Sequence, residues 1–90
     1  MKFFNWNLEK NEWLKQNRKI SFEEIVGAIS EGFAMEVFDH PDQTKYKGQK
    51  VFSILINGYI YLVPFVENEN EIFLKTIIPS RKATKKHLKL

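Results

Sequence analysis

Apolar and polar residues follow two different periods along this chain, and the period separates helices from strands. Within residues 22–29, apolar side chains recur at the i, i+3, i+4 and i+7 positions that form one face of a helix. Ser21 followed by Glu24 forms a capping box directly before this run, and Gly32 stands where a glycine commonly follows a helix. The pattern therefore predicts a helix that begins after Ser21 and ends before Gly32.

Another helix is predicted nearer the N-terminus, over residues 8–17. Asn7 is a suitable N-cap residue, and Glu9 in the first turn suits the positive end of the helix dipole. We expect Trp13 and Leu14 to be the inward-facing residues of this helix. Its remaining positions are mostly charged, as on a helix that covers the outside of a sheet.

Five further runs are rich in β-branched and aromatic residues, which favour strands. These runs are Phe3–Trp6, Phe33–Phe38, Lys50–Ile56, Tyr59–Val66 and Ile72–Ile78. Asn57-Gly58 joins the third run to the fourth and predicts a tight hairpin. Both of these runs are apolar on both faces, so we expect them to be central strands. Pro64 lacks an N–H and predicts a bulge or a strand end.

The order of these elements predicts an α+β domain over residues 1–90. Strands joined by tight turns must be antiparallel, so we expect a small antiparallel sheet of about four or five strands. The two N-terminal helices would pack on one face of it. Beyond Pro79, a short basic helix is predicted from about Arg81 to Leu88.

The charge of the chain is unevenly distributed. The 90 residues carry a formal net charge of +3 and no cysteine. Residues 75–90 contain six of the fourteen basic residues and none of the eleven acidic ones. A basic tract of this kind attracts phosphate, an acidic partner or an anionic surface, although many domains also end in a solvated lysine-rich helix.

Composition excludes several kinds of chemistry. Without cysteine there is no disulfide, no cysteine-ligated zinc and no thiol nucleophile. His40 and His87 lie far apart, and no glycine-rich phosphate loop is present. We therefore expect no metal and no small-molecule cofactor. No apolar run approaches the roughly 20 residues of a membrane helix, so we expect a cytoplasmic protein without a membrane partner.

Cations in the C-terminal tract can act on an RNA backbone in two ways. They can hold phosphates, and they can stabilise the phosphorane that forms when a 2′-hydroxyl attacks phosphorus. The cations share helix faces in two sets, Arg81 with Lys85 and Lys82 with Lys86 and Lys89, and Lys75 in the last strand can join them. The proton acceptors considered are His40, Tyr46, Tyr59, Tyr61 and a nearby glutamate. Packing is the commoner role of a strand tyrosine, and His40 suits a solvated turn.

Two tryptophans admit two interpretations as well. Trp6 and Trp13 can stack on nucleic-acid bases. We favour the alternative, in which both belong to the core between the first helix and the sheet.

Three stretches, in this order, resemble the BrnT-type toxins, which are ribonucleases of type II toxin–antitoxin pairs with a RelE-like fold. Trp6, Lys10-Asn11 and residues 20–24 (Ile-Ser-Phe-Glu-Glu) are similar to the opening of that family. Residues 37–41 (Val-Phe-Asp-His-Pro) are similar to its Val-Phe-Asp-Asp-Pro turn. Residues 77–84 (Ile-Ile-Pro-Ser-Arg-Lys-Ala-Thr) resemble its Ile-Ile-Ser-Ala-Arg-Lys-Ala-Thr close.

The resemblance implies a metal-independent endoribonuclease that cleaves messenger RNA, inhibits translation and is neutralised by a cognate antitoxin. Arg81 matches the family's C-terminal arginine and Lys82 the basic residue beside it, so we expect both to bind phosphate and stabilise the transition state. His40 or Tyr46 is the expected general base. The expected supporting RNA-binding cations are Lys10, Arg18, Lys75, Lys85 and Lys86.

The chain also departs from the family, which keeps a competing hypothesis open. Arg18 stands where the family commonly has a histidine, and Lys75 or Thr76 where it often has an arginine. These changes keep positive charge but remove groups for proton transfer and bidentate binding. They favour a non-catalytic module that uses the same basic helix to bind an acidic protein or nucleic acid. A plain scaffold with a solvated lysine tail is the third hypothesis.

Overall fold

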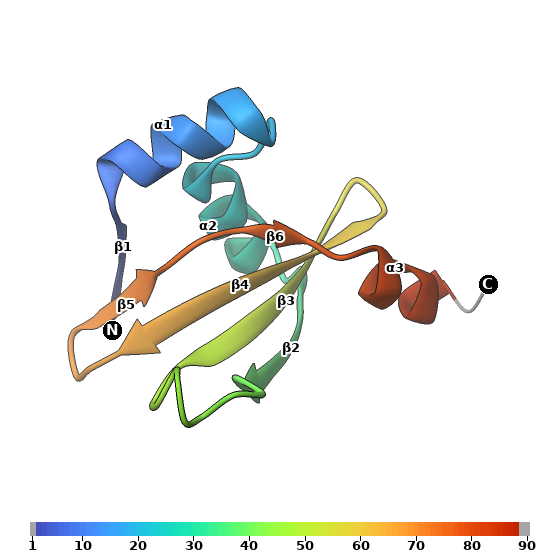
Figure 1. Ribbon diagram of the computed structural model, residues 1–90. Coiled ribbons are helices and arrows are strands. Elements are labelled where there is room, and N and C mark those ends of the chain that lie inside the picture. The colour runs from blue at the N-terminus through green and yellow to red at the C-terminus, as the bar shows by residue number, and fades with distance from the viewer. Residues whose placement is uncertain (1, 89–90) are drawn as a thin grey trace.

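The computed structural model describes residues 2–88, and within them three helices flank a mixed β-sheet (Figure 1). In chain order the elements are β1 (Phe3–Trp6), α1 (Leu8–Asn17), α2 (Phe22–Ser30), β2 (Ala34–Asp39), β3 (Lys50–Ile56), β4 (Tyr59–Glu67), β5 (Glu71–Leu74), β6 (Ile78–Pro79) and α3 (Arg81–Leu88). The predicted α+β class is confirmed at this level. None of the described helices is long and apolar enough to cross a membrane.

The sheet has the order β1-β5-β4-β3-β2, and the short strand β6 also pairs with β4. The pair of β1 and β5 is parallel, and every other strand pair of the sheet is antiparallel. The prediction of a purely antiparallel sheet is therefore wrong for β1. This strand has no tight turn to fix its direction, because α1 and α2 connect it to β2 at the opposite edge of the sheet.

The hairpin between β3 and β4 has the predicted geometry. Asn57 and Gly58 have positive φ angles of 51° and 77°, as a two-residue type I′ turn requires. The two strands that it joins lie in the middle of the sheet, which confirms that they are central.

The chain that follows β4 and pairs with it is interrupted opposite Pro64. A single strand was predicted over Ile72–Ile78, but the structure has β5 and β6 with a break between them. Two residues of β4, 63–64, oppose three of the returning chain, 75–77. The Pro64 carbonyl accepts a hydrogen bond of 2.8 Å from the Lys75 amide in this break. The predicted bulge thus falls in the partner strand, and β4 itself continues through the proline.

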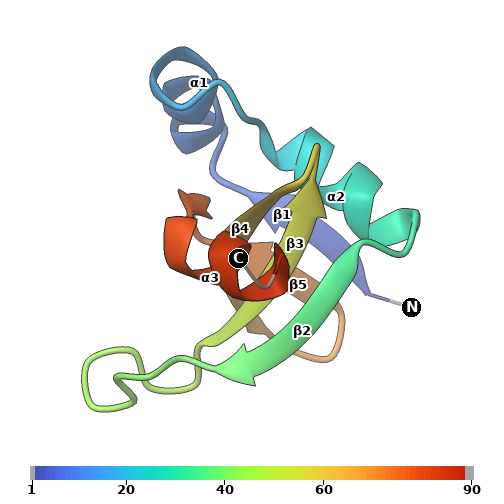
Figure 2. The same cartoon turned by 90° about the vertical axis from the view of Figure 1, so that its right-hand side faces the viewer.

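Helices α1 and α2 pack on one face of the sheet, as predicted. Leu14 of α1 and Phe22 and Ile25 of α2 are fully buried. They meet alternate residues of the inner strands, namely Phe52, Ile54, Val63, Phe65 and Leu74. In Figure 2, α2 and α3 lie on opposite sides of the strands.

The two tryptophans differ in burial: Trp6 packs against the core, whereas Trp13 is exposed. Trp6 stacks on Phe22 with ring centroids 5.7 Å apart and belongs to the periphery of the core. Trp13 was also expected to face inward, but 44% of it is exposed. The side chain of Trp13 instead lies against two cations, Lys10 and Arg18, whereas Asn11 turns toward α2.

Asn11 is 97% buried and joins α1 to the start of α2. Its Oδ1 accepts a hydrogen bond of 2.8 Å from the Phe22 amide, and its Nδ2 donates to Glu23 Oε1 at 2.8 Å. The hydrogen bond from Asn11 is the main cause that holds the pKa of Glu23 below its usual value. The capping box between Ser21 and Glu24 is present at the same helix end. The joint therefore brings together two parts of the first stretch that resembles BrnT-type toxins, Lys10-Asn11 and residues 20–24.

Candidate functional site

Helix α3 is fixed to the start of β4 by two hydroxyl residues. The Ser80 amide donates to the Ile60 carbonyl at 2.9 Å, and the Ser80 hydroxyl accepts from the Ala83 amide at 3.1 Å, which caps the helix. Thr84 is buried, and its Oγ1 accepts from the Ile60 amide at 2.8 Å while donating to the Ser80 carbonyl at 2.7 Å. Both hydrogen-bonding groups of Ile60 thus hold α3 in place.

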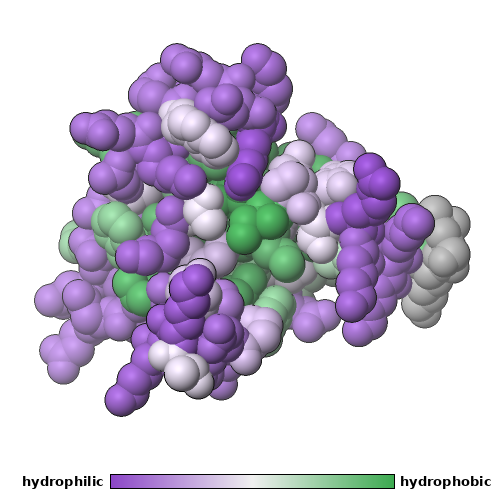
Figure 3. All heavy atoms as spheres, in the orientation of Figure 1, coloured by the Kyte–Doolittle hydropathy of each residue, from purple (hydrophilic) through white to green (hydrophobic). Residues whose placement is uncertain are grey.

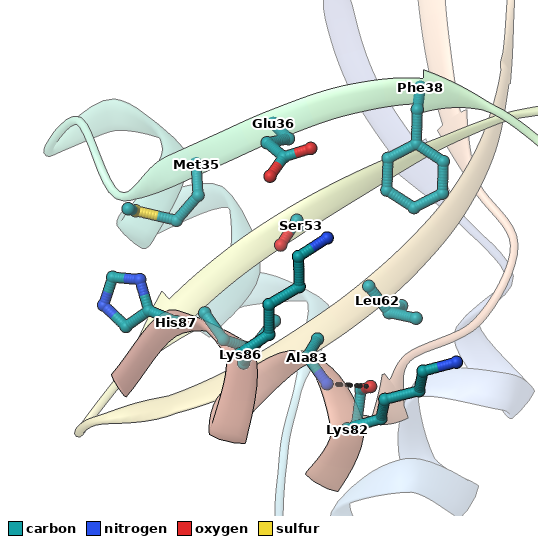
Figure 4. Close-up of a pocket in the computed structure, with 11 residues that line it drawn as sticks. Met35, Glu36, Phe38, Ser53, Leu62, Lys82, Ala83, Lys86 and His87 are labelled. Carbon is teal, nitrogen blue, oxygen red and sulfur yellow. Dashed lines mark hydrogen bonds between the residues drawn. The ribbon is translucent and has the colours of Figure 1, made fainter. Parts of the chain in front are cut away.

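A groove of about 640 Å³ lies between α3 and the exposed face of β2, β3 and β4 (Figure 4). Its floor includes Glu36, Ser53 and Leu62, which the strand register places in one row across the three strands. Ile78, 41% exposed, pairs with Leu62 and extends this row onto β6. The wall opposite is formed by Lys82, Ala83, Lys86 and His87 of α3.

The groove combines apolar side chains, among them Phe38 and Leu62, with positive charge on its helical wall. Lys82 and Lys86 are one helical turn apart, and in Figure 4 Lys86 extends over Ser53 toward the strands while Lys82 points toward the other end of the groove. Glu36 is the one carboxylate among the groove-lining residues. Figure 3 shows apolar atoms at the centre of the neighbouring face, between hydrophilic atoms over α1 and α3.

Arg81 and Lys85 occupy other positions on α3. Both are exposed, and neither lines the groove. Among residues 2–88, neither side chain forms an ion pair. Arg81 is in the first turn of α3, directly after the cap residue Ser80. Lys89, predicted to share a face with Lys82, lies outside the described residues.

His40 and Tyr46 lie together in the loop between β2 and β3, with ring centroids 4.2 Å apart. Neither lines the groove, and in Figure 2 this loop lies beyond the ends of the strands, apart from α3. The Asp42 amide donates to His40 Nδ1 at 3.1 Å, so the lone pair of that nitrogen is already engaged. The structure thus brings the two expected bases next to each other but does not bring them to Lys82.

The remaining predicted cations are spread along the approach to α3. Lys10 Nζ and the Arg18 guanidinium lie 4.5 and 5.1 Å from the centre of the Trp13 ring. Arg18 also donates a hydrogen bond to the Ile77 carbonyl, at the break before β6. Lys75 Nζ lies 5.6 Å from the centre of the Phe73 ring. Arg18 and Lys75 therefore flank the chain that leads into α3, whereas Lys10 is further out on α1.

Four polar residues of the groove lining were not among the predicted site residues: Glu36, Ser53, Ser80 and His87. Glu36 and His87 matter chemically, because they are the proton acceptors on the groove lining. His87 follows Ala83 by one helical turn, so the helical period of α3 was a usable signal for it. Glu36 and Ser53 could be found only once the register of β2 and β3 was known.

Comparisons with protein families, with curated proteins and with solved structures each find no match to this chain. No group of three or more histidine, aspartate or glutamate side chains among residues 2–88 is placed to hold a metal ion. The chemistry of the groove is therefore argued from its lining residues.

Proposed function

We propose that the chain is a BrnT-type endoribonuclease toxin with a RelE-like fold, which cleaves messenger RNA in the cytoplasm and is neutralised by a cognate antitoxin. One observation carries this proposal. The basic residues of the stretch that most resembles the family, 77–84, continue into a helix whose Lys82 and Lys86 line a groove. Two residues of the same stretch hold that helix on the sheet, Ser80 through its backbone amide and Thr84 through its hydroxyl.

The groove suits a single strand of RNA. Lysine ammonium groups on one wall can bind successive phosphates, and the apolar side chains of Phe38 and Leu62 on the floor and near wall offer a surface for bases. Arg81 at the first turn of α3 can bind a further phosphate in bidentate fashion.

Cleavage in this groove would use the RNA's own 2′-hydroxyl. A base removes the 2′ proton and the 2′ oxygen attacks phosphorus. The bond from phosphorus to the 5′ oxygen breaks as that oxygen takes a proton from a protonated groove-lining group or from water, giving a 2′,3′-cyclic phosphate and a 5′-hydroxyl. Glu36 and His87 are the groove-lining groups that can accept the proton. Lys82 and Lys86, which line the groove, would stabilise the charge of the phosphorane.

Induced expression of Lys82→Ala/Lys86→Ala beside the wild type tests this proposal. The wild type is expected to stop growth and fragment RNA, and the double variant is expected to do neither. Lys15→Ala is the matched control, because Lys15 is an exposed lysine on α1 whose ion pair with Glu12 lies on the surface. Unchanged growth arrest by the double variant would contradict the proposal.

A non-catalytic binding module is the second candidate, and the position of His40 and Tyr46 favours it. Both expected bases lie outside the groove, so the groove can bind RNA without the chemistry assigned to them. This candidate predicts that the purified wild type binds RNA and leaves it intact. Loss of cleavage in Glu36→Gln or His87→Gln, with RNA binding retained, would decide for the nuclease.

A further inference from the structure

Trp13 is an exposed aromatic side chain that lies beside two cations. It is 44% exposed, although tryptophan is a residue that usually contributes most of its surface to a core. Lys10 Nζ and the Arg18 guanidinium carbon lie 4.5 and 5.1 Å from the centre of its ring. The core position expected for Trp13 is wrong, which leaves base stacking as the alternative that the sequence offered for this ring.

The two cations beside Trp13 are held differently. Arg18 donates a hydrogen bond to the Ile77 carbonyl, which fixes its guanidinium next to the chain that enters β6. Lys10 forms no ion pair within residues 2–88. The attraction of an exposed lysine to an aromatic ring is weaker than the stacking of a nucleic-acid base on that ring. A base can therefore replace the Lys10 ammonium on Trp13, and the ammonium is then free to bind a phosphate.

Arg18 also links this ring to the groove beside α3. Ile77, whose carbonyl Arg18 contacts, is followed by Ile78, which is 41% exposed and pairs with Leu62 of the groove floor. From there β6 leads directly into α3 (Figure 1). A strand of RNA that leaves the groove across Ile78 therefore meets Arg18 next, and the Trp13 ring beyond it.

Charge at the ring suits a phosphate on either side of a stacked base. Lys10 and Arg18 bring two positive charges to Trp13. Glu9, one helical turn before Trp13, brings one negative charge to the same side of α1. Glu12, which precedes Trp13, is paired with an exposed lysine at 3.2 Å. Positive charge therefore predominates around the ring.

We propose that Trp13 is a base-stacking platform that extends the RNA-binding groove beyond β6. One base of a single strand stacks on the ring, Lys10 binds an adjacent phosphate, and the N–H groups of Arg18 that do not face Ile77 bind another. Every base has a π-face, so this contact adds affinity without selecting a sequence. The inference rests on the proposed function for the strand in the groove, but it requires no cleavage.

Binding of a single-stranded RNA of about 12 nucleotides to purified protein tests the inference. Trp13→Ala is expected to weaken binding about 5- to 150-fold, as the loss of one stacked base implies. Trp13→Phe keeps a ring and should weaken binding less. Phe33→Ala is the matched control, because Phe33 is also 44% exposed and does not line the groove. Equal affinity of Trp13→Ala and the wild type overturns the inference.

The salt dependence of the same binding separates stacking from a purely structural role of the ring. Trp13→Ala removes no phosphate contact, so its slope of log K against log salt concentration should equal that of the wild type. Lys10→Ala should reduce the slope by about 0.7, the contribution of one phosphate contact. A reduced slope in Trp13→Ala would show that the ring only holds its cations in place, which overturns the inference.

Tryptophan emission reports the stacking contact directly. The chain has two tryptophans, and Trp6 stacks on Phe22 at the periphery of the core. Saturating RNA should quench the emission of the wild type, because a stacked base quenches the ring that it covers. The emission of Trp13→Phe, which comes from Trp6 alone, should not change. Equal quenching of the wild type and Trp13→Phe overturns the inference.

Failure of this inference is distinguishable from failure of the proposed function. If Lys82→Ala/Lys86→Ala weakens RNA binding and Trp13→Ala does not, RNA occupies the groove without reaching α1, and the inference alone is overturned. If Trp13→Ala weakens binding of the cognate antitoxin and leaves RNA affinity unchanged, the ring serves a protein partner, and again the inference alone is overturned. A wild type that binds no RNA contradicts both proposals.

Discussion

Thr84 is the residue on which the position of α3, and with it the groove, depends most. Its hydroxyl accepts from the Ile60 amide at 2.8 Å and donates to the Ser80 carbonyl at 2.7 Å, and the residue is buried. Thr84→Val keeps the shape of the side chain but removes both hydrogen bonds. The Ile60 amide is then left buried without an acceptor.

The expected loss of stability follows from that unpaired group. A buried donor without a partner costs about 1–3 kcal/mol. For a domain of this size, each kcal/mol lowers Tm by roughly 4–8 °C. Thr84→Ser keeps the hydroxyl and loses one methyl group, about 1 kcal/mol at a buried site, so it should be the milder variant whenever the hydrogen bonds dominate.

Urea denaturation and hydrogen exchange together measure this effect. Thr84→Val should unfold at lower urea than Thr84→Ser, and the Ile60 amide in Thr84→Val should exchange about 5- to 150-fold faster than in the wild type, as 1–3 kcal/mol implies. RNA affinity should fall in parallel, because α3 carries Lys82 and Lys86. If Thr84→Val is as stable as the wild type, or if the two variants behave alike, the argument that this hydroxyl anchors α3 is refuted.

Three further predictions concern the body of the fold. Asn11→Ala should lower the free energy of unfolding by about 1–3 kcal/mol in urea titrations, because the buried Phe22 amide loses its acceptor. A loss below about 0.5 kcal/mol, as is usual for substitutions on the surface, would contradict this. Lys2 and Lys50 hydrogen-bond to Glu67 and lower its pKa, so this group adds stability above the unfolded pKa of about 4.5 that is lost as pH falls through the lower folded value. Glu67→Gln should therefore flatten the decline of the urea midpoint between about pH 5 and pH 3, and an unchanged profile would count against it. Gly58→Ala should cost about 1–2 kcal/mol, since φ is 77° at this position, and an equal Tm would argue against the type I′ turn.

Local signals in the sequence were enough for the elements whose geometry is set by neighbouring residues. Ser21 and Glu24 predicted the start of α2 because a capping box is complete within one helical turn. Asn57 and Gly58 predicted the central hairpin because both residues tolerate positive φ. The N-cap of α1 at Asn7 and the basic helix after Ser80 were likewise predicted from neighbouring residues.

Elements that depend on distant partners were predicted less well. The parallel pairing of β1 with β5 involves strands about 68 residues apart, and nothing in Phe3–Trp6 encodes the direction of its partner. Trp13 was expected in the core because it is large and apolar, yet its position on α1 faces Lys10 and Arg18. Asn11 was not expected to be buried, since a polar residue can be buried only with partners such as Phe22 and Glu23 from another element.

The candidate site shows the same division. Lys82 and Lys86 could be predicted from helical spacing within α3. Glu36 and Ser53 reach the groove only through the pairing of β2 with β3. His40 and Tyr46 were chosen by residue type, and residue type does not say where the loop between β2 and β3 will lie.

The most direct test of the groove is the salt dependence of single-stranded RNA binding by purified protein. For single strands, each phosphate contact contributes about 0.7 to the slope of log K against log salt concentration. Loss of two contacts in Lys82→Ala/Lys86→Ala should therefore reduce the slope by about 1.4, with little change in Lys15→Ala. Equal slopes for the wild type and the double variant would show that RNA does not bind in the groove beside α3.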